Sequence, residues 1–356
     1  MDKSFWGRTQ DDDDVYRYTI KGKKGIAAVV TNYGAILTEL YVPVQGGGTR
    51  DIALGYRRLE DYFENNPNFG ATIGRHANRI GGAAFDLNGK HYELAKNDND
   101  KNNLHSGPDG YHKRVWEVTD ETDYSITFHL DSPDMDQGYP GNLGIDVTYT
   151  VTDDNALIID YHGISDADTI FNPTNHSYFN LNGHDAGSIL DHILSLEADE
   201  FTYADEYSIP DGTVRDVTGT PMDFREPTAL GDRIDTDYDV LNFAGGYDHN
   251  YILNRDDGLR TPSFDDNGLT LYHAASVTTP SKDITMEVYT DLPGIQLYAG
   301  NYITSSEVGK DGKNYDKRYG FCLETQYYPN AINIPSFPQP VIKAGEDRFT
   351  RTVYKF

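Results

Sequence analysis

Short strand-like runs separated by turn residues recur along almost the whole of this 356-residue chain. β-Branched and aromatic side chains favour strands, and turns at this spacing are typical of all-β domains. The runs rich in Val, Ile, Thr and Tyr span residues 16–20, 25–30, 35–42, 91–94, 126–129, 145–151, 156–164, 251–253, 269–273 and 284–290. The 3.6-residue periodicity of amphipathic helices is scarce. We therefore predict an all-β fold, a large antiparallel β-sandwich rather than a barrel or a βαβ fold.

One hairpin and one helical turn can be placed within this pattern. Asn88-Gly89 lies between two strand-like runs and is a strong signal for a two-residue hairpin turn. Residues 58–64 favour a short helical turn. No stretch rich in Pro, Gly and Ser divides the chain, and no repeat recurs at a fixed period. We therefore expect residues 1–356 to form a single domain.

The chain is strongly acidic. It has 30 Lys and Arg against 57 Asp and Glu, a formal net charge of −27 at pH 7. Such a surface repels nucleic-acid phosphates and anionic lipids, so neither is an expected partner, and it disfavours a phosphorylated substrate. A neutral ligand fits best, although the excess of acid is equally interpreted as a means of solubility. The 27 tyrosines suit half-wet strands and also a sugar site.

The sequence also indicates a compartment. The first residues are polar and lack the apolar core of a signal peptide. No apolar run approaches the roughly 18 residues of a membrane helix. Cys322 is the single cysteine, which excludes an intramolecular disulfide. We expect a cytoplasmic protein.

Two segments in the first third of the chain concentrate possible ligand-binding residues. Strand alternation would place Arg75 and Arg79 on one face and Asn78 on the other, and the guanidinium groups could hold hydroxyls or an oxyanion. A pair of surface salt bridges is the alternative interpretation. His105 precedes a Ser-Gly-Pro turn and could present a ring nitrogen to a ligand. A structural histidine is the alternative there.

Two later segments each carry one candidate acid–base group. If residues 172–181 are extended, His176, Tyr178 and Asn180 share one face. Histidine is the side chain that most readily gives or takes a proton near neutral pH. Glu324 lies in an apolar, aromatic stretch, where desolvation would raise the pKa and the basicity of its carboxylate. A glutamate on a wet strand face is the alternative.

Two glycine-flanked segments add polar groups. Asp248 could accept hydrogen bonds from neighbouring sugar hydroxyls, and Gln296 could add an amide. Ordinary loop chemistry is the alternative for both.

Taken together, these segments resemble the aldose 1-epimerase (galactose mutarotase) family. The resemblance runs from residues 32–35 to residues 340–345. Its most specific motifs are Gly-Arg-X-X-Asn-Arg-Ile at 74–80, Asn-His-Ser-Tyr-Phe-Asn-Leu at 175–181, Tyr-Asp-His at 247–249 and Leu-Glu-Thr-Gln at 323–326. It implies the galactose mutarotase-like β-supersandwich with an open cleft for a monosaccharide. Two small departures, Ser106-Gly107-Pro108 and Pro173, concern the shape of that cleft.

The resemblance also implies an activity and roles for individual residues. The activity is interconversion of the α and β anomers of free aldohexoses such as galactose and glucose. His176 is similar to the acid that protonates the ring oxygen, and Glu324 to the base that takes the anomeric proton. The residues expected to hold sugar hydroxyls are Arg79, His105, Asp248, Gln296, Asn78 and Tyr178. The expected enzyme is an isomerase without metal or cofactor, a monomer or homodimer, and no metal-ligand spacing, phosphate loop or dinucleotide fingerprint stands in the sequence.

Three other functions stay open on the sequence. An epimerase of hexose 6-phosphates would need further cationic residues at the cleft. A glycosidase would ordinarily need two carboxylates flanking the scissile bond, whereas the paired groups here are His and Glu. A non-catalytic carbohydrate-binding module would have no use for an aligned acid and base.

Overall fold

Antiparallel strands make up nearly all of the regular structure. The computed structural model describes residues 1–255 and 268–356. Helical segments within these ranges are short: α1 (Asp239–Ala244) and the 3₁₀ turns η1 (Leu59–Tyr62), η2 (Gly81–Ala83), η3 (Tyr111–Lys113), η4 (Leu230–Asp232), η6 (Lys310–Gly312) and η7 (Ala331–Asn333). The predicted all-β fold is confirmed. In the described parts of the chain, no helix has the length and apolar character needed to cross a bilayer.

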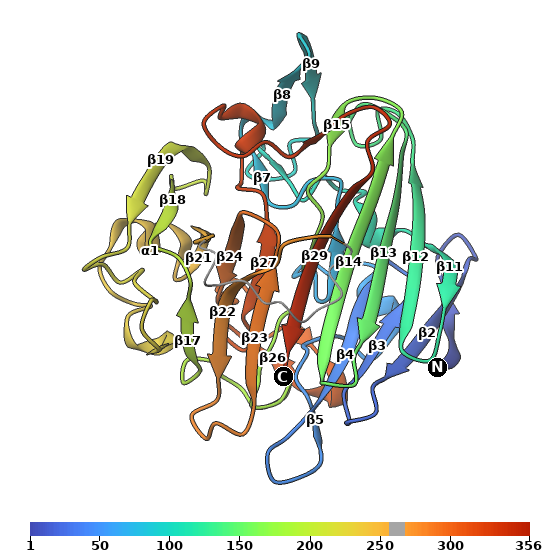
Figure 1. Ribbon diagram of the computed structural model, residues 1–356, viewed down its shortest axis with the longest axis vertical. Helices are drawn as coiled ribbons and strands as arrows, with labels where there is room; N and C mark the ends of the chain where they lie inside the picture. Colours follow the sequence, from blue (N-terminus) through green and yellow to red (C-terminus); the bar gives the residue numbers. More distant parts are fainter. Residues whose placement is uncertain (256–267) are drawn as a thin grey trace.

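A nine-stranded sheet forms the broad face of the molecule in Figure 1. The C-terminal strand lies near its middle, between two strands that both precede it in the chain and are more than 100 residues apart from each other. In spatial order its strands are β11 (Glu117–Glu121), β12 (Ser125–Ser132), β13 (Leu143–Val151), β14 (Ala156–Ser165), β29 (Arg348–Lys355), β23 (Thr285–Thr290), β22 (Tyr272–Thr278), β17 (Ile193–Leu196) and β20 (Thr228–Ala229).

Two five-stranded sheets accompany the large one. The first is an N-terminal meander whose strands follow chain order: β1 (Asp2–Arg8), β2 (Asp14–Lys21), β3 (Ala27–Thr31), β4 (Ile36–Pro43) and β5 (Thr49–Asp51). The second has the order β19 (Pro210–Asp216), β18 (Glu200–Ala204), β21 (Asp248–Ile252), β24 (Gly294–Tyr298) and β27 (Cys322–Gln326).

Five two-stranded ladders connect the sheets and carry the loops above them. They pair β6 (Ala71–Ile73) with β16 (Thr174–His176), β7 (Arg79–Ile80) with β10 (Asn103–Leu104), β8 (Ala84–Leu87) with β9 (Lys90–Glu93), β15 (Thr169–Ile170) with β28 (Val341–Ile342), and β25 (Glu307–Val308) with β26 (Asn314–Tyr315). The β8–β9 ladder is the predicted hairpin. Asn88 and Gly89 both have positive φ, as a type I′ turn requires. The predicted helical turn is η1.

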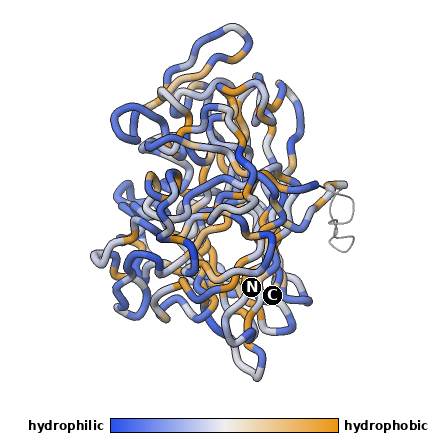
Figure 2. Tube along the Cα trace, turned by 90° about the vertical axis from the view of Figure 1, so that its left-hand side faces the viewer, coloured by the Kyte–Doolittle hydropathy of each residue, from blue (hydrophilic) through white to orange (hydrophobic). Residues whose placement is uncertain are grey.

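One continuous hydrophobic core joins the three large sheets. It contains Tyr18 of β2, Val147 of β13 and Leu297 of β24, each almost fully buried. Alternation along β13 is strict, since every second residue from Leu143 to Val151 is buried. Figure 2 shows the same arrangement along the trace, with hydrophobic segments inside and hydrophilic segments at the periphery. The sheets are therefore packed as a sandwich.

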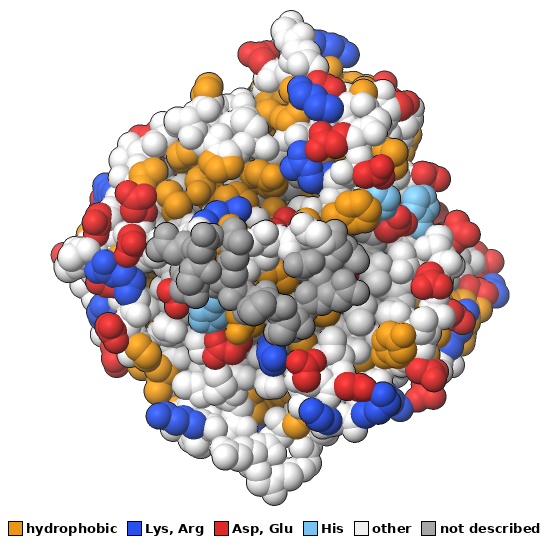
Figure 3. All heavy atoms as spheres, in the orientation of Figure 1, with side chains coloured by type: hydrophobic (Ala, Val, Ile, Leu, Met, Phe, Trp, Pro, Cys, Tyr) orange, Lys and Arg blue, Asp and Glu red, His pale blue; other side chains and the backbone are white. Residues whose placement is uncertain are grey.

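The surface carries the acidic charge that the composition predicts. Figure 3 shows Asp and Glu side chains spread over the face of the large sheet, with Lys and Arg between them. Many charged side chains of the described residues form exposed pairs, such as Arg8 with Asp12 and Lys23 with Asp153. Exposed pairs of this kind contribute little to stability, so the charge bears on solubility and partners more than on the fold.

Candidate active site

A cleft of about 460 Å³ brings together the sequence-nominated residues, Gln296 excepted. It lies against the edge of the five-stranded sheet that ends in β27, beside the β16–β6 ladder. The nominated residues that line it are Asn78, Arg79, His105, His176, Tyr178, Asp248 and Glu324. Residues 66–68, 302–304, 306 and 307, with Leu104 and Tyr298, complete the wall.

The registers of neighbouring strands explain why residues far apart in sequence meet here. Asp248 of β21 pairs with Tyr298 of β24, and Gln296 of β24 pairs with Glu324 of β27. β16 packs beside β27, where the Thr174 hydroxyl donates a hydrogen bond of 2.8 Å to the carbonyl of residue 325. Side chains one position apart on a strand face opposite ways, so this register sets the catalytic candidates on one side.

His176 and Glu324 face each other inside the cleft. Nε2 of His176 lies 3.6 Å from Oε1 of Glu324, and the side chains are 7% and 3% exposed. Burial lowers the pKa of His176 from 6.5 to about 4. Burial, reinforced by Asp248 and partly offset by Arg79, raises the pKa of Glu324 well above 4.5. Both shifts favour neutral forms, because a charge in a low-dielectric site is costly.

His105 is held in one tautomer. The backbone N–H of Asn78 donates to its Nδ1 at 3.1 Å, so the neutral ring carries its proton on Nε2 and offers a donor. Burial, with smaller contributions from His176 and Arg79, holds the pKa of His105 well below 6.5. Its ring stands edge-on to that of His176, with centroids 5.3 Å apart. His105 therefore suits hydrogen bonding to a sugar better than proton transfer.

The floor below His105 is made by residues in an unusual backbone conformation. Asn78, His105 and Ser106 have φ values of 61°, 51° and 69°, in the left-handed region that non-glycine residues rarely adopt. The Ser106 hydroxyl accepts from the backbone N–H of His76 at 2.7 Å and donates to the carbonyl of the same residue. Such conformations persist only where surrounding contacts enforce them, and they gather at functional sites.

Arg79 is oriented by a carboxylate that the sequence analysis missed. Its Nε donates to Oδ2 of Asp98 at 3.0 Å, with the two side chains 16% and 12% exposed. The Arg79 side chain also lines the cleft. Asp98 is fixed in turn by two backbone hydrogen bonds with Asn102. Asp98 is identified only by its contact with Arg79, 19 residues away in the sequence. In the sequence it stands in the polar run Asp98-Asn99-Asp100, where nothing distinguishes it from its neighbours.

Asp248 is supported by a line of amides. Gln296 donates to Oδ1 of Asp248 at 2.7 Å, and Gln326 donates to Oε1 of Gln296 at 3.2 Å. Gln326 also donates to Asn250 at 3.2 Å. Burial raises the pKa of Asp248, and the positive charge of Arg79 and the hydrogen bond from Gln296 partly offset this rise. Gln296 lies behind Asp248 and outside the cleft lining, and Gln326 is a second residue that the sequence analysis did not nominate.

Tyrosines form one wall of the cleft. The Tyr178 ring lies 5.1 Å from that of His176, and Tyr298 stands edge-on to Tyr178 at 5.8 Å. Tyr302, which is 62% exposed, continues the wall from Tyr298. Aromatic faces of this kind can cover the apolar C–H face of a sugar ring while polar groups opposite hold its hydroxyls.

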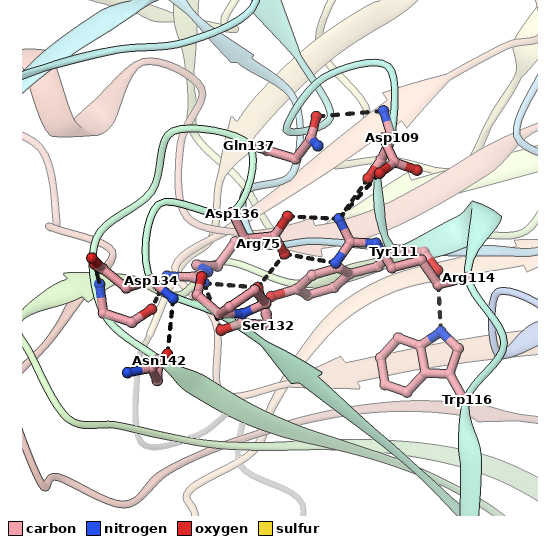
Figure 4. Close-up of polar contacts among 12 residues, drawn as sticks. Arg75, Asp109, Tyr111, Arg114, Trp116, Ser132, Asp134, Asp136, Gln137 and Asn142 are labelled. Atoms are coloured by element: carbon pink, nitrogen blue, oxygen red, sulfur yellow. Dashed lines mark hydrogen bonds and ion pairs between the residues drawn. The ribbon is translucent and has the colours of Figure 1, made fainter.

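Arg75 does not share the face of Arg79, so the prediction from strand alternation is wrong for this pair. The left-handed Asn78 turns the backbone between them, and residues 75–78 are not a strand. Figure 4 shows the Arg75 guanidinium among the segments at Ser132 and Asn142, below the side chains of Asp136 and Arg114. It donates to the carbonyls of residues 132, 133, 140 and 141 and to the Ser132 and Thr169 hydroxyls. Arg75, 2% exposed and outside the cleft lining, is thus a structural anchor.

The charges of the cleft favour a neutral ligand. Among the described residues that line it, Arg79 is the one Lys or Arg side chain, and it is paired with Asp98. Glu324, Asp248 and Glu307 supply carboxyl groups. The further cations that a sugar phosphate would require are not found within this part of the lining. His176, Cys322 and Glu324 form a buried group of potential metal ligands in the described chain.

Comparison with known proteins finds relatives that match most of the length of this chain. Residues 16–355 match the profile of the aldose 1-epimerase family. Galactose mutarotase of Homo sapiens is 40% identical over 327 residues, 92% of this chain and 90% of that protein. Aldose 1-epimerase of Escherichia coli K12 is 33% identical over 349 residues, 97% of this chain and 96% of that protein.

Solved structures show the same fold. The GalM/aldose epimerase homologue from C. elegans superposes with a TM-score of 0.85 at 29% identity, covering 95% of this chain and 98% of that one. Galactose 1-epimerase from Lactobacillus acidophilus NCFM gives a TM-score of 0.84 at 27% identity, covering 99% and 97%. With the family profile and both curated relatives spanning the strands that build the cleft, the chain belongs to the aldose 1-epimerase family, a family of isomerases.

Proposed function

We propose that this chain interconverts the α and β anomers of free aldohexoses such as galactose and glucose, with His176 as general acid and Glu324 as general base. The observation that carries the proposal is the buried pair in the cleft, 3.6 Å apart and unencumbered by other side-chain ion pairs among the described residues. The names of the relatives, galactose mutarotase and aldose 1-epimerase, support the substrate class.

The separation of the pair suits the geometry of ring opening. The anomeric hydroxyl oxygen and the ring oxygen are bonded to the same carbon, so a base at one and an acid at the other must lie within a few ångströms of each other. Glu324 takes the proton of the anomeric hydroxyl while His176 protonates the ring oxygen, and the bond between C1 and the ring oxygen breaks. The aldehyde rotates about C1–C2 and closes on its other face. Each positioned proton transfer typically contributes about 10²- to 10⁴-fold.

The proton count of the pair is unchanged by the reaction. Burial favours a neutral imidazole beside a protonated carboxyl, and moving that one proton from Glu324 to His176 gives the imidazolium and carboxylate that ring opening uses. Ring opening moves one proton from the sugar to Glu324 and another from His176 to the sugar. Ring closure reverses both transfers, so the pair ends as it began.

The remaining cleft residues are proposed to hold the sugar. Arg79, Asn78 and the Nε2–H of His105 are donors, and the carboxylate of Asp248 is an acceptor for neighbouring hydroxyls. Tyr178 supplies an aromatic face. Gln296 acts through Asp248, which its amide holds in place. We also propose that the chain is a single-domain cytoplasmic protein and a monomer or homodimer. Light scattering of the purified chain tests the oligomeric state.

Polarimetry tests the catalytic proposal directly. Freshly dissolved α-D-galactose and α-D-glucose should drift to equilibrium faster with the wild-type protein. Glu324→Gln and His176→Asn should each slow the drift by orders of magnitude while circular dichroism stays unchanged. Asp12→Asn, an exposed control, should behave as wild type. Sugar binding without faster anomer exchange would establish a carbohydrate-binding protein, and activity confined to hexose 6-phosphates would establish the other epimerase.

A further inference from the structure

Cys322 is the one cysteine of the chain, and its thiol lies against the proposed acid. Sγ is 3.6 Å from Nδ1 of His176, while Oε1 of Glu324 is 3.6 Å from Nε2 of the same ring. All three side chains are buried. The proposed ring opening by His176 and Glu324 does not use the Cys322 thiol. The position of the thiol beside these two side chains is therefore not explained by that reaction.

The three side chains match the donor set of a zinc site. One donor atom from each, Sγ, an imidazole nitrogen and a carboxylate oxygen, lie within 4.8 Å of one another. Donors around a tetrahedral Zn²⁺ stand about 3.3 to 3.7 Å apart. Cys322 and Glu324 now face opposite ring nitrogens of His176, so binding one ion requires side-chain movements that bring both to the same nitrogen. Thiolate and imidazole favour Zn²⁺ and its soft neighbours over Mg²⁺ or Ca²⁺.

A second observation points to a ligand independently of the cysteine. Oε2 of Glu324 is buried and has no hydrogen-bond partner within the described chain, although its side chain is only 3% exposed. Buried carboxylates are ordinarily paired or bound to a cation. His176 and Glu324 also line the cleft, so an ion held by them would keep a coordination position open to it.

We propose that Cys322, His176 and Glu324 bind one thiophilic divalent cation such as Zn²⁺, and that the bound cation inhibits the enzyme. The thiol and the Glu324 carboxyl each release a proton to solvent, and the thiolate, an imidazole nitrogen and the carboxylate each donate an electron pair to the cation. The acid and the base are then unavailable to the sugar, and the open position lies where the sugar binds. Only the inhibition rests on the proposed epimerase activity, because the binding is a property of the three side chains.

Cobalt is the probe that reports the site directly. Co²⁺ added to the metal-free full-length protein should give a thiolate-to-metal charge-transfer band that saturates at one equivalent and disappears when Zn²⁺ is added. Because the chain has a single cysteine, the band assigns the ligand to Cys322. Cys322→Ser and Cys322→Ala should abolish the band and weaken Zn²⁺ binding at least about tenfold. Thermal unfolding confirms that either variant is folded.

A matched control removes a surface histidine instead. His129 and His162 flank Asp146 on the outer face of the large sheet, at 2.7 and 3.2 Å, and could bind metal non-specifically. His162→Gln should leave the charge-transfer band and the Zn²⁺ sensitivity unchanged. In polarimetry, Zn²⁺ should slow mutarotation competitively with sugar, EDTA should restore the rate, and Cys322→Ser should need at least about tenfold more Zn²⁺ for the same fractional inhibition.

The outcomes separate the two proposals. Absence of a charge-transfer band from the wild-type protein, or equal Zn²⁺ inhibition of wild type and Cys322→Ser, overturns the metal site. A normal band in a protein that never accelerates mutarotation overturns the proposed function and leaves the metal site standing.

Discussion

Removing the charge of Asp98 should weaken catalysis although Asp98 is outside the acid–base pair. Asp98→Asn keeps the size of the side chain and one acceptor oxygen for Nε of Arg79, but the partner is no longer ionised. A hydrogen bond to a charged group contributes about 1.5 to 3 kcal/mol, and the amide retains part of it. With the pair only 16% and 12% exposed, solvent screening is weak. We expect a loss of about 1.5 kcal/mol, which is about tenfold in kcat/KM.

The assay is polarimetry of α-D-galactose over a range of concentrations, with Asp98→Asn, Arg79→Ala and the double variant. If Asp98 acts through Arg79, Asp98→Asn should have no further effect once Arg79 is alanine, because the two changes remove the same interaction. Asp12→Asn, which breaks an exposed pair with Arg8, is the control for charge removal and should leave kcat/KM unchanged. Full activity of Asp98→Asn, or the same loss in both backgrounds, would refute the reasoning.

Four other predictions follow from contacts described above. Gln326→Leu removes the hydrogen bond that Gln326 donates to Gln296 and the one that it donates to Asn250, so KM should rise several-fold with a smaller change in kcat, and a kcat loss at constant KM would contradict the amide line. The acid limb of the pH–rate profile should lie near the pKa of about 4 of His176 rather than near 6.5, because a second proton enters the pair only there, and the limb should move in His176→Asn. Arg75→Met leaves several buried carbonyls without donors and should cost about 3 kcal/mol or more in urea unfolding, with Arg75→Lys recovering only part. His273 is pulled two ways: burial lowers its pKa, but hydrogen bonding to Glu287 prevails and raises it above 6.5, so the stability it adds is complete below 6.5 and lost as pH rises through the folded value. The urea midpoint should therefore fall with rising pH in that window, and His273→Gln should flatten the fall.

Sequence reasoning predicted the fold because its signals are local. Alternation along residues 145–151 and the Asn88-Gly89 turn each need only neighbours in the chain, and the structure has β13 and the β8–β9 hairpin there. The order of the strands within each sheet could not be predicted from such local signals. Nothing within residues 348–355 indicates that β29 pairs with both β14 and β23.

The residues of the candidate site likewise fall into those predicted from local motifs and those identified only by contacts between distant parts of the chain. Motifs nominated His176, Glu324, Arg79 and Asp248, and the structure brings their side chains to one cleft. Asp98 and Gln326 were missed because their function lies in contacts with residues distant in sequence. The face predicted for Arg75 was wrong because one left-handed residue, Asn78, breaks the alternation on which the prediction depended.

The place of β29 in the large sheet has a consequence for biosynthesis. β29 follows every other strand of that sheet in sequence, yet it lies between β14 and β23. Until it emerges from the ribosome, both neighbours present open edges, and unpaired edges invite pairing with other chains. A nascent chain stopped before residue 348 would therefore hold every proposed catalytic group and still lack the strand that joins the two halves of the sheet. Chaperone dependence should therefore be greatest in the interval before residues 348–355 are released, while both edges are still unpaired.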